Sequence, residues 1–160
     1  MPSTYDKIAT NTLGSAAASV TFSSIPLTYT DLVLVQVSQI TTGAGTGTIQ
    51  INGDIASNYS NTFLTGNGST ATSTRNSSTV IFSGDASATD LQTSIYSFQN
   101  YANTTTYKTV LIRSNVASGS LSAVVGMWRS TTALDAIKVG TNTSTFIAGS
   151  TFTLYGIKAA

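Results

Sequence analysis

The only carboxylate side chains in this sequence are aspartates, because it contains no glutamate. Histidine and cysteine are absent as well. Without these residues, Ser-His-Asp and Cys-His catalysis, thiolate chemistry and the usual zinc sites are excluded. The aspartates are Asp6, Asp31, Asp54, Asp85, Asp90 and Asp135. We therefore expect no catalytic residue, no metal ligand and no cofactor.

Asp85 and Asp90 are the two aspartates closest in sequence, in the stretch SGDASATD. A glycosidase would hold two carboxylates roughly 5–9.5 Å apart across a cleft. We favour a structural interpretation, in which both are turn residues that bond to nearby backbone. The stretch also lacks the dense oxygen ligands of a calcium-binding loop. A glycan-cleaving enzyme is therefore disfavoured.

Trp128 is the single tryptophan, and it is the first candidate for ligand contact. If its ring were exposed beside Tyr59 or Tyr101, it could stack on a sugar. A tryptophan on a strand is more often buried, with its indole N–H satisfied. Trp128 and Tyr59 are thus the candidate binding residues, and a core or interface role is the favoured alternative for Trp128.

Composition predicts the type of element that positions these side chains. Charged residues make up 8% of the chain and hydrophobic residues 41%, whereas an average domain is about 25% charged. Ser and Thr take the place of the missing charges. Thr favours strands because its branched side chain fits a pleated surface, and the absent glutamate is a good helix former. The sequence therefore predicts an all-β protein with a nearly neutral, hydroxyl-rich surface.

Apolar alternation between turn signals predicts about 8–9 strands. Their number and spacing favour a jelly-roll-like antiparallel β-sandwich with long polar loops. We expect a single domain over residues 1–160, with a short N-terminal arm over about residues 1–18. The clearest strands are residues 19–25, 32–40, 107–114, 121–129 and 150–158.

The strand over residues 32–40 has apolar residues at both alternating sets of positions. Val33, Val35 and Val37 share one face, and Leu32 and Leu34 share the other. Such a run is typical of a central strand that is buried on both sides. On this basis Val35→Asp is expected to unfold the domain, because a buried unpaired charge costs several kcal/mol.

The glycine-rich and polar stretches predict loops. The stretch GAGTG at residues 43–47 lacks the spacing of a nucleotide-binding loop and predicts a flexible connection. Asn52-Gly53 predicts a type I′ hairpin turn with Ile55 on the returning strand. Residues 58–78 are almost wholly polar and predict an extended loop. A short helical turn is allowed near TTALDA, residues 131–136.

Charge and hydropathy exclude two classes of partner. The net charge is +1, with the basic residues scattered from Lys7 to Lys158, so there is no basic face for nucleic acid. No apolar run approaches 18 residues, the length typical of a membrane-spanning helix. The N-terminal stretch lacks the basic start and apolar centre of a secretory signal. We expect neither nucleic-acid nor membrane binding.

Several stretches together resemble small virion proteins of tailed phages, particularly phages that infect cyanobacteria and other aquatic bacteria. The stretches are IATNTLGSAAASVTFSSIP, YTDLVLV, FLTGNGS, YANTTTYKTVL, GMWRST and AGSTFTLYGIKAA. They cover nearly the whole chain, and none of them is catalytic. The resemblance implies a multimeric β-sandwich that either decorates the capsid or forms part of a fibre, located on the virion after synthesis in the host cytoplasm.

From the resemblance we expect a capsid decoration or cement protein without enzymatic activity, which bridges neighbouring subunits of the major capsid protein. A homotrimer is the expected assembly, because closed symmetry fits threefold positions of a shell. The chain opens at Met1 and shows no repetitive shaft, which favours a decoration protein over a long fibre. The alternative is a tail-fibre or receptor-binding module that contacts host surface glycans.

Overall fold

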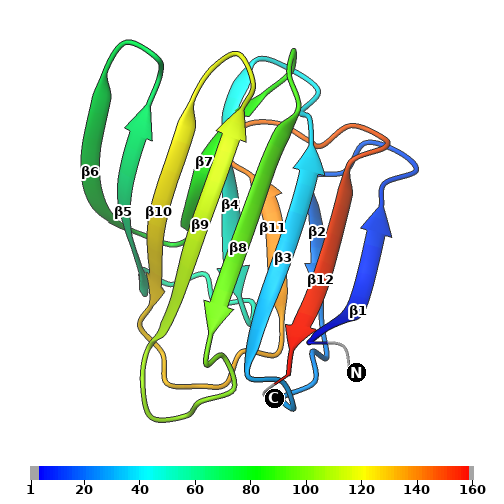
Figure 1. Ribbon diagram of the computed structural model, residues 1–160, viewed down its shortest axis with the longest axis vertical. Coiled ribbons are helices and arrows are strands. Elements are labelled where there is room, and N and C mark those ends of the chain that lie inside the picture. The colour runs from blue at the N-terminus through cyan, green and yellow to red at the C-terminus, as the bar shows by residue number, and fades with distance from the viewer. Residues whose placement is uncertain (1–3, 159–160) are drawn as a thin grey trace.

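The computed structural model describes residues 4–158 and consists of strands and loops (Figure 1). Twelve strands form two antiparallel sheets. The eight-stranded sheet has the order β1-β12-β3-β8-β9-β10-β5-β6, and the four-stranded sheet has the order β2-β11-β4-β7. The strands are β1 (Tyr5–Thr12), β2 (Ser19–Phe22), β3 (Asp31–Ser38), β4 (Ala44–Ile51), β5 (Tyr59–Gly66), β6 (Ala71–Ser78), β7 (Ile81–Ser87), β8 (Gln92–Gln99), β9 (Lys108–Val116), β10 (Leu121–Trp128), β11 (Ile137–Thr141) and β12 (Thr151–Ile157).

The predicted fold class, an all-β antiparallel sandwich, is confirmed. The described residues contain no helix, and the helical turn allowed at residues 131–136 is not formed. None of the described segments is therefore a helix that could cross a membrane. The four-stranded sheet lies behind the eight-stranded sheet in Figure 1, and the chain passes repeatedly between the two layers.

Twelve strands exceed the predicted number because three polar segments also pair. The segment predicted as an N-terminal arm contains β1, which pairs with β12 at one edge of the large sheet. The loop predicted over residues 58–78 is instead the β5–β6 hairpin at the other edge. The glycine-rich stretch at residues 43–47 lies mostly within β4. Backbone pairing with a neighbouring strand, which apolar periodicity does not report, stabilises these segments.

The confirmed hairpin of β9 and β10 lies at the centre of the large sheet, with Ser114 opposite Ser122. The predicted hairpin at Asn52-Gly53 is wrong. Both residues have positive φ, 51° and 68°, and Asp54 N–H donates to Ile51 O at 3.0 Å, so a tight turn does form. However, β4 does not pair with β5, and the turn carries the chain from the small sheet to the large one.

The register of β3 assigns its two faces differently from the sequence-based prediction. Leu32 and Leu34 are fully buried, whereas Val33, Val35 and Val37 are only partly buried. The leucines point between the sheets, and the valines lie on the outer side of the large sheet. The expectation that Val35 is a core residue is therefore wrong, and the reason given for unfolding by Val35→Asp no longer applies.

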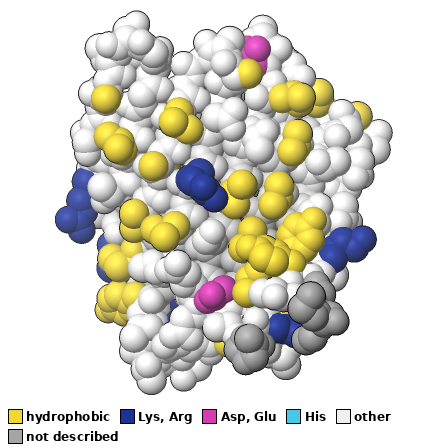
Figure 2. Space-filling view, in the orientation of Figure 1, with side chains coloured by type: hydrophobic (Ala, Val, Ile, Leu, Met, Phe, Trp, Pro, Cys, Tyr) yellow, Lys and Arg dark blue, Asp and Glu magenta, His cyan; other side chains and the backbone are white. Residues whose placement is uncertain are grey.

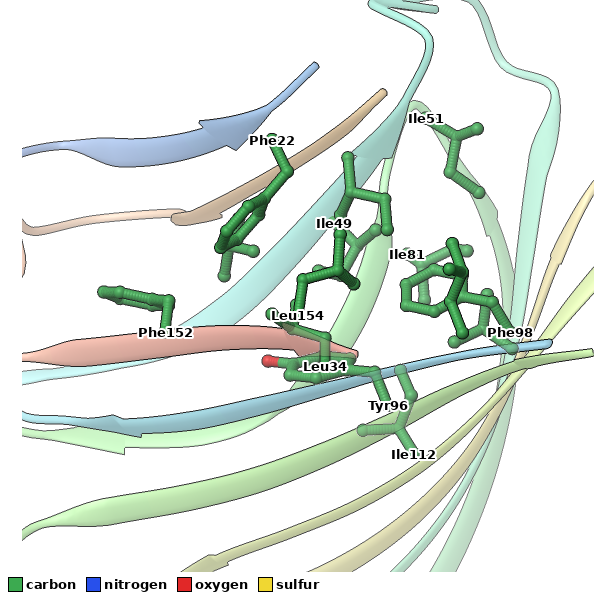
Figure 3. Packing of buried hydrophobic residues seen from close by; sticks show 14 of the residues in the cluster. Phe22, Leu34, Ile49, Ile51, Ile81, Tyr96, Phe98, Ile112, Phe152 and Leu154 are labelled. Carbon is green, nitrogen blue, oxygen red and sulfur yellow. The ribbon is translucent and has the colours of Figure 1, made fainter. Parts of the chain in front are cut away.

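The core lies between the two sheets and combines aliphatic and aromatic side chains. Figure 3 shows Leu34, Ile112, Phe152 and Leu154 of the large sheet facing Ile49 of the small one. Phe146 and Phe152 pack edge to face, with ring centroids 5.0 Å apart. This burial provides the main stabilising term for a chain with few ion pairs. The ion pair found among residues 4–158 joins Lys158 to Asp6 near the two ends of the chain.

A polar network lies at one end of the core. Gln92 Nε2 donates to Ser94 and Ser114 at 3.2 Å each, and Tyr96 donates to Gln36 Oε1 at 2.6 Å. Burial raises the pKa of Tyr96 to about 12, so its hydroxyl stays protonated and can donate. Satisfied buried polar groups fix one arrangement of the strands. In this network, amide and hydroxyl side chains fix the arrangement of the strands without any charged group.

Candidate functional site

The two candidate binding residues from the sequence, Trp128 and Tyr59, are both buried. Trp128 Nε1 donates to Asp54 Oδ2 at 2.7 Å, and the Tyr59 hydroxyl donates to Asp54 O at 3.0 Å. Burial raises the pKa of Tyr59 to about 12. Neither ring offers a free face to a sugar, so the stacking hypothesis is wrong for both residues and the core interpretation of Trp128 is confirmed.

Asp54 is the common partner in this network. Its carboxylate also accepts hydrogen bonds from Ala56 N at 2.8 Å and from Asn58 Nδ2 at 2.9 Å. These donors, Trp128 first, lower the pKa of Asp54 below its ordinary value of 3.8. Hydrogen bonds to the ionised form of a carboxyl favour that form. The network therefore fixes the crossing from β4 to β5.

Asp85 and Asp90 line one pocket of about 340 Å³ together with the loop between β9 and β10. Asp85 lies within β7, not in a turn, and accepts a hydrogen bond from Ser120 Oγ at 2.5 Å. Asp90 accepts one from Ser118 Oγ, also at 2.5 Å. The two carboxylates thus bind this loop to the edge of the small sheet.

The surroundings of Asp90 do not suit a general acid. Hydrogen bonds from Ser118 and Thr89 lower the pKa of Asp90. A general acid needs the opposite, a pKa raised toward neutrality. Within residues 4–158, no three side chains of the metal-ligating types gather to form a metal site. The arrangement holds two loops together without the features of an acid–base pair.

The outer side of the eight-stranded sheet is the most unusual surface of the molecule. We call it the outer face and define it by three rows of directly opposed residues across neighbouring strands. The rows are Tyr155–Val33–Ser97–Leu111–Val125–Thr62, Thr153–Val35–Ile95–Arg113–Ala123–Leu64 and Thr151–Val37–Thr93–Asn115–Leu121–Gly66. Every row carries at least two large apolar side chains.

Many of these apolar side chains are well exposed. The exposed fraction is 57% for Leu64, 44% for Leu111, 64% for Leu121 and 47% for Val125. Figure 2 shows hydrophobic side chains spread over this side, with a basic side chain near the middle. Arg113 is the basic residue of the central row, between Ile95 and Ala123.

A shallow apolar groove of about 590 Å³ runs over β5, β9 and β10 within the outer face. The outer-face residues that line it include Leu64, Leu111, Arg113, Ala123 and Val125. Sequence reasoning missed this surface because it assigned the alternate valines of residues 32–40 to the core. The signal that could have revealed it lies in residues 32–37, where apolar residues occupy both alternating sets of positions. Each sheet of a sandwich has only one internal side, so one of these two sets must lie on the outer side.

No family model matches the chain, and no curated protein matches it. Among solved structures, the alginate lyase Aly36B has 7% sequence identity, with 92% of this chain and 77% of that chain covered, at a TM-score of 0.37. An exo-inulinase from Aspergillus awamori has 11% identity, with 96% and 29% covered, at a TM-score of 0.33. Similarity at this level carries no argument about activity or ligand.

Proposed function

We propose that this protein is a non-catalytic structural component of a tailed-phage virion that decorates and stabilises the capsid. In this proposal the outer face of the eight-stranded sheet attaches the protein to neighbouring subunits of the major capsid protein. The observation that carries the proposal is the exposure of apolar side chains in all three rows of that face.

The outer face has the dimensions of a protein interface. Six strands about 4.8 Å apart, with three rows about 7 Å apart, define an area of roughly 600 Å². A standard interface covers about 800 Å² on each partner. The outer face, with apolar side chains at about half of its positions, is therefore large enough to form the centre of such an interface.

The scarcity of charge on this face fits attachment to a particle. Apolar and neutral contacts depend little on ionic strength, whereas exposed ion pairs are screened by salt. A homotrimer would present three outer faces at once, and joined sites gain about 10²–10⁴ in avidity. Many modest contacts would then hold the protein firmly on a repeating lattice.

The test is binding of the purified protein to purified heads of the phage that encodes it, followed by sedimentation. We expect saturation at hundreds of copies per head, with little loss of binding between about 0.1 M and about 1 M salt. Leu111→Ser combined with Val125→Ser should reduce binding strongly. Ile55→Ser is the matched control, because Ile55 is 77% exposed but lies at the turn after β4.

Two results would contradict the proposal. The first is a virion that carries only a few copies, located at the tail, which would support the receptor-binding alternative. The second is equal binding of heads by the unmodified protein and the doubly substituted outer-face variant. Imaging of the intact particle at residue resolution would show directly which side of the sandwich meets the capsid.

A further inference from the structure

The outer side of the four-stranded sheet carries a groove of different character. We call it the polar groove and define it by Ser19, Thr48, Gln50, Phe82, Lys138 and Asn142. One row of directly opposed residues is Ser19–Gly140–Thr48–Phe82, and the next is Thr21–Lys138–Gln50. Gly140 lies at the floor of the groove and has no side chain to fill it. A Cβ at this position would occupy the space beside Thr48, 3.2 Å from its Oγ1.

The unequal width of the two sheets supplies the wall of the groove. The large sheet has eight strands and the small one four, so the β5–β6 hairpin extends past β7, the edge strand of the small sheet (Figure 1). Asn61 of β5 joins the two layers here: its Oδ1 accepts from Phe82 N at 3.0 Å, and its Nδ2 donates to Val80 O at 3.1 Å.

Two adjoining hollows of about 380 Å³ and about 300 Å³ make up this region, and both are lined by Phe82 and Asn142. Their volumes are at the lower end of the range of small-molecule sites, about 300–1,000 Å³. Phe82 is partly exposed and rests against Phe63, with ring centroids 6.4 Å apart. An aromatic ring is thus held in place where the two hollows meet.

The hydrogen-bonding groups of the groove are largely unused within the protein. In the described part of the chain, the side chains of Thr48, Gln50 and Lys138 have no hydrogen-bond or ion-pair partner. A hydroxyl, an amide and an ammonium group therefore point to solvent beside one fixed aromatic ring. Hydroxyl-rich ligands with apolar ring faces match this combination of groups.

The charges of the groove indicate a ligand without net charge. Lys138 lies opposite Gln50, and Asp85 lies opposite Thr46, so the two charges flank Phe82 along β4. Four residues of strand separate the two positions, a distance of about 13 Å. With the Lys138 ammonium group at one end and the Asp85 carboxylate at the other, the part of the groove around Phe82 carries no net charge.

We propose that the polar groove binds a neutral oligosaccharide, with a sugar ring on Phe82 and hydroxyl groups bonded to Gln50, Thr48 and Lys138. This site goes beyond the proposed attachment and does not depend on it, because the groove and the outer face lie on opposite sides of the sandwich. A copy attached through the outer face would present the groove to the surroundings, where the glycans of a host surface are the available ligands.

The test is a titration of the isotope-labelled full chain, followed by amide chemical shifts, with maltohexaose, cellohexaose, laminarihexaose and xylohexaose. Concentrations up to about 10 mM detect millimolar dissociation constants. We expect at least one of these probes to shift Thr48, Gln50 and Phe82 together. Phe82→Ala should weaken binding at least about tenfold, and Gln50→Ala about 2–10-fold, as expected for one lost hydrogen bond.

Phe82 also packs against Phe63, so loss of binding in Phe82→Ala could reflect a change of fold. Gln50 has no internal partner among the described residues, so Gln50→Ala reports on ligand contact alone. Val125→Ser, on the outer face, is the matched control and should bind the sugar normally.

The acidic oligosaccharide hexagalacturonate serves as the charged comparison in the same titration. Three outcomes would overturn the proposal: no shift in the groove with any neutral probe, shifts confined to the outer face, or binding of hexagalacturonate alone. Failure of the attachment proposal is separate, because Gln50→Ala should bind phage heads normally whether or not the sugar site exists.

Discussion

Replacing neighbouring residues of β3 tests which of its sides is internal. Leu34 is fully buried between the sheets, and Val35 is partly buried on the outer face. Leu34→Ala leaves a cavity beside Leu154 and Tyr96, the residues opposed to Leu34 on β12 and β8, and truncations of this kind cost about 2–5 kcal/mol. Val35→Ala leaves no internal cavity, and its cost should be about 1 kcal/mol or less, mainly through strand propensity.

Urea and thermal unfolding would measure the difference. For a domain of this size, each 1 kcal/mol lowers the melting temperature by about 2–4 °C. Leu34→Ala should therefore lower it by about 4–20 °C, and Val35→Ala by at most about 4 °C. The dependence on urea should keep the same slope in both variants, so that the midpoints report stability alone. Val35→Asp should fold, but it should fail to bind phage heads.

Equal destabilisation by Leu34→Ala and Val35→Ala would refute this reasoning. A shift of one residue in the pairing of β3 exchanges every side chain between the two sides of the sheet. The valines of β3 would then be internal, and the outer face would lose the apolar positions that β3 contributes. The comparison therefore tests which side of β3 is internal.

Two further predictions concern close contacts. Gly126→Ala should cost about 1–3 kcal/mol or more, because a Cβ there would lie 2.4 Å from Ile81 Cγ2 across the two sheets, whereas Gly66→Ala has open space and should leave the melting temperature almost unchanged. Trp128→Phe should cost about 1–3 kcal/mol at neutral pH through the lost bond to Asp54. The pKa of this carboxyl is lowered on folding, so its contribution is present above pH 3.8 and is lost as the pH falls through the folded-state pKa. The difference in the free energy of unfolding between Trp128→Phe and the unmodified protein should therefore become smaller in acid. Denaturant titrations at neutral and at acid pH measure this difference, and an equal value at the two pH values would contradict the role of this bond.

The sequence predicted the elements whose apolar residues alternate or form a compact run. Residues 32–40, 107–114 and 121–129 were predictable as strands because tertiary burial and strand propensity agree there. The β5–β6 hairpin was not, because β6 is exposed almost throughout and carries Ala, Ser, Thr, Arg and Asn. Its pairing comes from backbone hydrogen bonds to β5, and side-chain periodicity contains no record of them.

The candidate site could not be predicted for a related reason. In residues 32–37, apolar residues occupy both alternating sets of positions, so periodicity alone does not decide which set is internal. Trp128 seemed the best candidate for sugar contact, yet its partner Asp54 lies 74 residues earlier in the chain. The polar groove depends on the overhang of one sheet past the other, and only the pairing order of the twelve strands reveals it.

The low charge of the chain is explained by what each surface must do. A free-standing sandwich keeps its outer strand positions soluble with lysine and glutamate, yet β3 carries valine at three outer positions and β10 carries Leu121 and Val125. Exposed apolar rows of this extent promote association unless another surface covers them. At the edge of the same sheet, β6 carries serine, threonine and asparagine and remains in water. Because this chain places polar residues where the sheet is wet, the exposed large apolar side chains in every row of the outer face argue that this face is covered in the proposed function. The large sheet would then support a polar groove that stays open on the opposite side.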